Sequence, residues 1–129
     1  MTISNTFLRV GTLSLICGVA LGMWMGANEE FTLRPVHAHI NLIGWTSMMI
    51  FGFFYRLFPD AASGLMPKAH LGLSIIGFIA MMSGLTAMLL GNVSLLPLLL
   101  GGEVLTAVSI LLFAFILLRS TGGRTTVSA

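Results

Sequence analysis

The chain has 129 residues, of which 57% are hydrophobic and 8% are charged, and its mean hydropathy is +1.02. Soluble domains carry about 25% charged residues, so this composition excludes a soluble globular protein and predicts an integral membrane protein. The net charge of +2 comes from few residues; it indicates basic loops beside membrane lipid headgroups and not a nucleic-acid-binding surface. Cys17 is the single cysteine, so it forms no intramolecular disulfide, and no Cys-x-x-Cys-His motif for covalent haem attachment is present.

Four apolar runs are long enough to cross a bilayer, because roughly 20 apolar residues cover its hydrocarbon core. Pro35 suits the first turn of the second run and Pro59 ends it, while Asn92 and Ser94 offer caps before the fourth. The first run contains a passable signal-peptide cleavage site at residues 25–27, but its length favours an uncleaved helix. We therefore predict a single all-α domain, 1–129, with a flexible tail over 120–129. Its four transmembrane helices are expected at about 7–27, 36–58, 68–91 and 95–118.

Basic residues predict how this bundle lies in the membrane. In a four-span bundle Arg34 falls alone on one side, and the others gather on the opposite side: Arg9, Arg56, Lys68, Arg119 and Arg124. Cytoplasmic loops carry the excess of Lys and Arg, so both termini are expected in the cytoplasm. We expect the membrane to be a bacterial inner membrane.

His37 and His39 open the second apolar run. An ionisable residue in a membrane segment is by default a candidate functional residue, and imidazole is a common ligand of haem iron, copper and zinc. Two residues correspond to about 200° of helix rotation, so the two rings should face opposite neighbours; the alternative is that both cap the helix at the interface. His70 lies roughly 27 Å away, too far to share an iron, and is expected at the other interface with a structural hydrogen bond.

Glycine recurs every four residues in the first apolar run, at Gly18, Gly22 and Gly26, with Gly11 one heptad earlier. Such a stripe lets something approach the backbone closely. The sequence leaves two alternatives, a closely packed helix or a flat porphyrin.

Glu103 is the only carboxylate well inside an apolar run. It must pair, protonate or meet water there. It could hold a histidine tautomer or carry protons, or it could be a protonated acid bonded to Asn41, Thr86 or Thr106.

Several short motifs follow one another from the second to the third run. They are His37-Ala38-His39, Gly44-Trp45, Phe51-Gly52, Tyr55, Pro59, Ala69-His70-Leu71 and Gly77. This segment resembles haem–copper oxidase subunit I, in particular the cbb-type oxidases and the related nitric oxide reductases. The resemblance implies that His37 is the axial ligand of a high-spin haem and that His39 is that of a low-spin haem. Such an oxidase needs six histidines and this chain has three, so the chain alone is not a complete oxidase, and whether it is an enzyme stays open.

The leading hypothesis is a small membrane cytochrome that binds haem b for electron transport or gas sensing, with a possible respiratory-chain partner. The second axial ligand would come from a second copy in a homodimer, or from Met23 or Met25. The alternatives are a copper- or haem-binding assembly protein and a purely structural accessory subunit of an oxidase. The candidate cofactor-binding residues are His39, His37, Arg34, Gly18, Gly22, Trp45, Glu103 and Met25, with His39 and His37 as metal ligands.

Overall fold

A computed structural model describes residues 2–122, and this part of the chain is helical and contains no strand. Three of its helices are long and apolar enough to cross a membrane: Ile3–Asn28, Leu65–Leu89 and Val93–Thr121. The prediction of an all-helical membrane protein is confirmed to this extent. The predicted tail lies largely outside the described residues, and Ser120 and Thr121, which we expected in it, are helical.

The first helix, α1 (Ile3–Asn28), begins earlier than the hydropathy pattern predicts. The Thr2 side chain accepts a hydrogen bond from the amide of Asn5, which satisfies one free donor of the first turn. At the other end Glu29 adopts the left-handed conformation, with φ of 52°, and its amide bonds to the carbonyl of Met25. This is a common way to end a helix.

The second helical run is continuous from residue 34 to 57 but is not a uniform α-helix. It consists of α2 (Arg34–His39), the π-helix η1 (Ile40–Ser47) and α3 (Met48–Leu57). The hydroxyls of Thr46 and Ser47 donate to carbonyls five residues back, over 3.0 and 2.8 Å, which supports the wider helix. The sequence predicts one plain helix over 36–58 and gives no sign of this π segment.

Proline and glycine residues mark the boundaries of the remaining elements. Pro59 opens the short 3-10 helix η2 (Pro59–Ala62), and Gly64, with φ of 92°, precedes α4 (Leu65–Leu89). Gly91, with φ of 88°, follows α4, and Asn92 accepts from the amide of Ser94 at 3.1 Å to open η3 (Val93–Leu95). The last helix is α5 (Leu96–Thr121). The cap predicted at Asn92 is therefore formed, whereas Ser94 lies within η3 and donates to Asn92 instead of capping the fourth run itself.

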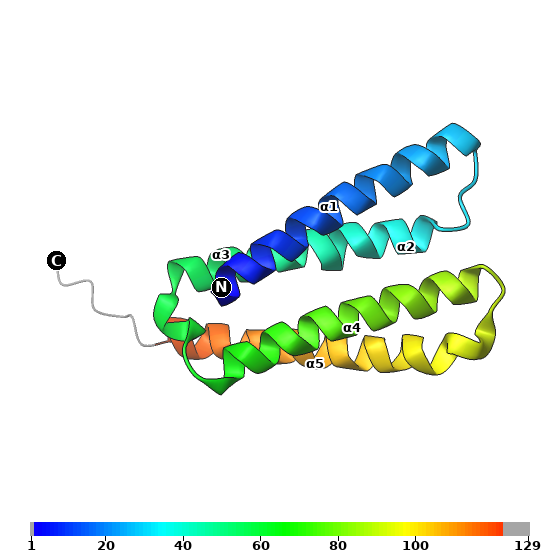
Figure 1. The fold of residues 1–129 in the computed structure, drawn as a ribbon. Helices are drawn as coiled ribbons and strands as arrows, with labels where there is room; N and C mark the ends of the chain where they lie inside the picture. Colours follow the sequence, from blue (N-terminus) through cyan, green and yellow to red (C-terminus); the bar gives the residue numbers. More distant parts are fainter. Residues whose placement is uncertain (1, 123–129) are drawn as a thin grey trace.

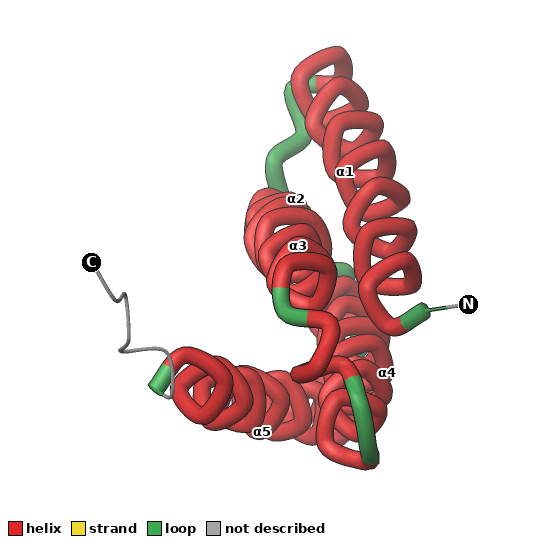
Figure 2. Tube along the Cα trace, turned by 90° about the vertical axis from the view of Figure 1, so that its left-hand side faces the viewer, coloured by secondary structure: helices red, strands yellow, loops and turns green. Residues whose placement is uncertain are grey.

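The helices form two hairpins that lie side by side (Figure 1). The α1–α2 and α4–α5 connections lie at one end of the molecule, which we call the hairpin end. The amino terminus, η2 and the end of α5 lie at the other, the terminal end. Viewed along the helices, α1 with α2–α3 forms one pair, and α4 with α5 forms the other (Figure 2).

Each end has its own apolar core. At the terminal end the buried cluster contains mainly aromatic side chains from α1 and α3, joined by Ile116 of α5: Phe7, Met48, Phe51, Phe54, Tyr55 and Ile116. At the hairpin end the buried cluster is Val36, Met81, Met82 and Leu99. Between the two clusters the interior is more polar, as described below.

Candidate functional site

The imidazole of His37 packs into α1. Its Nδ1 lies 2.9 Å from the carbonyl oxygen of Gly18, and because a carbonyl only accepts, Nδ1 carries the proton. The lone pair is then on Nε2, which lies 3.4 Å from the side-chain nitrogen of Asn41. His37 is half-buried in this position, so its ring is held by α1 and by its own helix.

A hydrogen bond within its own helix orients the imidazole of His39. Its Nδ1 donates to the carbonyl oxygen of Pro35 over 2.7 Å, which fixes the proton on Nδ1 and leaves the Nε2 lone pair uncommitted. Nε2 makes no hydrogen bond with any residue that the structure describes, and His39 is half-buried. A histidine that donates Nδ1–H to a backbone carbonyl and presents Nε2 is the usual arrangement of a metal-binding imidazole.

The glycine stripe of α1 receives side chains from the second helical run. A methyl group added at Gly22 would lie 2.8 Å from Cε1 of His37, and one at Gly18 would lie 2.7 Å from Oδ1 of Asn41. Gly11 faces the side chain of Met49 in the same way. Of the two alternatives that the sequence leaves, the structure has close packing, and a porphyrin on this stripe would have to displace both polar side chains.

His39 and Glu103 belong to different hairpins. His39 is the last residue of α2, directly before η1, and Glu103 lies in the first third of α5. No hydrogen bond joins His39 to Glu103, because the ring of His39 bonds to its own helix.

Glu103 is exposed and forms no hydrogen bond within residues 2–122. The bonds predicted to Asn41, Thr86 or Thr106 are not formed. Nor does Glu103 hold the tautomer of His39, since the Pro35 carbonyl already does so. A carboxyl group on an exposed face of an otherwise apolar helix needs a partner, a proton or water.

The other predicted site residues are dispersed. Arg34 is exposed, with its guanidinium 5.1 Å from the ring centre of Phe31. Trp45 is 37% exposed on η1. Met25 is buried, whereas Met23 is exposed.

His70 forms a hydrogen-bonded pair that the sequence does not predict in detail. It is completely buried, and its Nδ1 lies 2.9 Å from the hydroxyl oxygen of Tyr55. Phe7, Phe51 and Phe113 surround its ring. The structural hydrogen bond that we expected is present, but His70 is enclosed by helices instead of lying at the surface.

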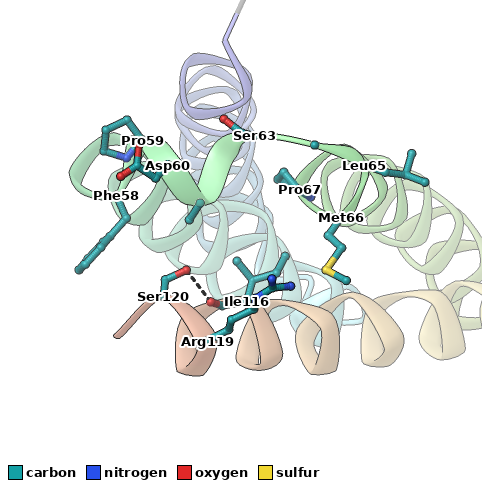
Figure 3. A pocket seen from close by; sticks show the side chains of 12 residues that line it. Phe58, Pro59, Asp60, Ser63, Leu65, Met66, Pro67, Ile116, Arg119 and Ser120 are labelled. Carbon is teal, nitrogen blue, oxygen red and sulfur yellow. Dashed lines mark hydrogen bonds between the residues drawn. The ribbon is translucent and has the colours of Figure 1, made fainter. Parts of the chain in front are cut away.

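A hollow of the described chain lies at the terminal end (Figure 3). It measures about 590 Å³ and lies between η2, the start of α4 and the end of α5. Asp60 and Arg119 both line it. None of the residues predicted to bind a cofactor does.

Taken together, fold and site define an all-helical protein with three helices long and apolar enough to cross a membrane. Two of its imidazoles have an Nε2 without a hydrogen bond in the described chain: that of His70 is buried in the aromatic core, and that of His39 is half-buried near the hairpin end. Comparison with protein-family models, curated proteins and solved structures finds no match for the chain. No group of three or more His, Cys, Asp or Glu side chains that could hold a metal ion occurs within residues 2–122. Haem iron needs only one or two axial ligands from protein, so His39 fits an axial role better than it fits a multidentate site.

Proposed function

We propose that this chain is a small integral membrane protein that binds haem b through His39 and serves in electron transfer or in sensing a diatomic gas. The observation that carries the proposal is the orientation of the His39 ring. Its Nδ1–H is donated to the Pro35 carbonyl over 2.7 Å and its Nε2 lone pair is free. This hydrogen bond also makes Nε2 a stronger electron donor to a metal.

The proposed arrangement takes residues 34–57 as a fourth membrane span, with both termini in the cytoplasm of a bacterial cell and the hairpin end facing outward. The run contains three helical parts of 6, 8 and 10 residues. Together they are long enough to cross the hydrocarbon core of a bilayer. His39 then lies near the outer face. Arg34, beyond it, is placed to pair with haem propionates.

The second axial ligand is proposed to come from a second copy of the chain. His37 points into α1 and bonds to Gly18, so it does not face the iron that His39 would bind. In a two-fold dimer the same surface meets itself, and two copies of His39 would ligate one iron. We propose for Glu103, an exposed carboxyl group of α5, the transfer of protons between the site and the membrane surface.

The test compares His39→Ala with His37→Ala in protein purified in detergent. We expect His39→Ala to lose the bound haem. His37→Ala should retain haem at an unchanged ratio per chain, although the protein will be less stable without its contact to Gly18. Haem content that is unchanged in His39→Ala, or lost only in His37→Ala, would overturn the assignment.

The alternative function is transient carriage of haem or copper during assembly of a respiratory oxidase. A single half-buried imidazole that belongs to no cluster of His, Cys, Asp or Glu side chains within residues 2–122 favours this alternative, because such a site releases its metal easily. Copper uptake that requires His39, in protein that shows no Soret band, would support the carrier over the cytochrome.

A further inference from the structure

A small cavity lies in the middle of the molecule, where the π-helix η1 meets α4 and α5. Its volume is about 10 Å³, which is room for the centre of one water molecule. Four of the side chains that line it end in a hydroxyl group: Ser47, Ser74, Thr106 and Ser109. The other four lining side chains are apolar: Ile43, Met48, Phe51 and Ile110. A buried water needs two to four polar partners, and in this cavity the hydroxyl groups are the side-chain groups that can provide them.

Each of the three serine hydroxyls already donates its proton to a backbone carbonyl. Ser47 donates to the carbonyl of Leu42 over 2.8 Å, and Ser74 donates to the carbonyl of His70 over 2.7 Å. Ser109 donates to the carbonyl of Thr106 over 2.9 Å. Each oxygen keeps a lone pair, so the three serines can only accept a further hydrogen bond.

Thr106 is the exception. Its residue is 6% exposed, and its Oγ1 is fully buried with no hydrogen-bond partner in the described chain. Gly77 of α4 packs directly against this residue, because a methyl group there would lie 2.9 Å from Oγ1 and 2.8 Å from the amide nitrogen of Thr106. Thr106 Oγ1 can therefore both donate and accept a hydrogen bond, and leaving a buried hydroxyl without a partner destabilises the fold.

We infer that this cavity binds one internal water molecule. Water donates two hydrogen bonds and accepts two, and buried waters typically make about three. It would donate to two of the serine oxygens and accept from the hydroxyl of Thr106. Water is small enough for the cavity, and it can donate to two serine oxygens while it accepts the hydrogen bond from Thr106.

The position of this water gives it a structural role. The lining residues come from η1, α3, α4 and α5, so the water would connect the two hairpins where the π segment ends. Because the serine protons are committed to backbone carbonyls, the site is a fixed tether and not a link in a proton path.

The test is the sign of the stability change in Thr106→Val. If water is bound, the variant removes one of its partners, and the thermal unfolding midpoint should fall by about 3–6 °C. If the cavity is dry, the same substitution removes an unsatisfied hydroxyl and the midpoint should rise. Thr106→Ser keeps the hydroxyl and should retain most of the wild-type midpoint. Thr86→Val, on α4 and away from the cavity, is the matched control for the loss of a threonine hydroxyl.

A direct measurement accompanies the stability test. In bilayers, solid-state NMR transfer of magnetisation from water should reach Thr106 and Ser109 of the wild type as fast as it reaches residues in the connecting loops. The transfer should vanish in Thr106→Val. A raised or unchanged midpoint in Thr106→Val, or no transfer to Thr106 in the wild type, would overturn the inference.

Discussion

At the scale of single residues, the decisive feature is how the two neighbouring histidines differ. His37 bonds to a backbone carbonyl of α1, and His39 bonds to one of its own helix. Both rings therefore carry the proton on Nδ1, but the Nε2 of His37 lies 3.4 Å from the side-chain nitrogen of Asn41, whereas the Nε2 of His39 makes no hydrogen bond in the described chain. The two-residue spacing predicts the divergence, whereas which ring faces α1 depends on tertiary packing that no local pattern encodes.

The fit of His37 against Gly22 leads to a prediction. Gly22→Ala places a methyl group 2.8 Å from Cε1 of His37, so the ring must move, and we expect a loss of roughly 1–3 kcal/mol of stability. Gly26→Ala is the matched control, because nothing lies within 4 Å of the added carbon. It should be neutral or slightly stabilising. Thermal unfolding followed by circular dichroism compares the two, and equal midpoints would contradict the packing described here.

At the scale of elements, α4 and α5 form the closest helix pair. A methyl group at Gly102 would collide with the backbone of Met81, and one at Gly84 would lie 2.5 Å from the amide nitrogen of Leu99. Small residues at such positions let two membrane helices approach. Backbone atoms cannot swing aside as a flexible side chain can, so this contact tolerates less change than the glycine stripe of α1.

Gly102→Ala should therefore separate α4 from α5 and lower the free energy of unfolding by about 2–3 kcal/mol. Gly101→Ala, one residue earlier, adds its methyl group in open space and should have little effect. Chemical or thermal unfolding in detergent measures both. A Gly101→Ala variant as unstable as Gly102→Ala would show that the helix pair is rotated relative to the structure.

The elements also show what the sequence can and cannot predict. Hydropathy and the prolines at 35 and 59 predict the helices, and their bounds differ from the structure by a few residues. The π segment was missed because its three polar residues, Asn41, Thr46 and Ser47, mark no clear face in eight positions, so the hydropathy period cannot distinguish an α-helix from a π-helix there. The orphaned Thr106 and the Tyr55–His70 pair were missed because each depends on partners from other helices.

At the scale of the whole molecule, the two ends differ in charge. Arg56, Lys68 and Arg119 lie at the terminal end, and Arg34 lies at the hairpin end. The proposed orientation follows from this difference. It can be tested in a Cys17→Ser background with single cysteines at Thr32 or Ser94 of the hairpin end and at Ser63 of the terminal end.

A membrane-impermeant maleimide added to intact cells should label the cysteines at positions 32 and 94. The cysteine at position 63 should react only after the membrane is opened. All three positions lie outside the three candidate spans or at their extreme ends, so each is accessible to the reagent from its own side. Labelling of position 63 alone in intact cells would reverse the orientation and place His39 near the cytoplasm.

The central claim, that the chain binds haem b through His39, is tested most directly by the absorption spectrum of the detergent-purified protein. The oxidised and dithionite-reduced forms are compared, and haem is quantified per chain. We predict sharp α and β bands in the reduced form, with half a haem per chain if two copies of His39 share one iron and one haem per chain if a methionine is the second ligand. The absence of a Soret band, even after reconstitution with haem, would contradict the claim and leave His39 as a candidate ligand for copper.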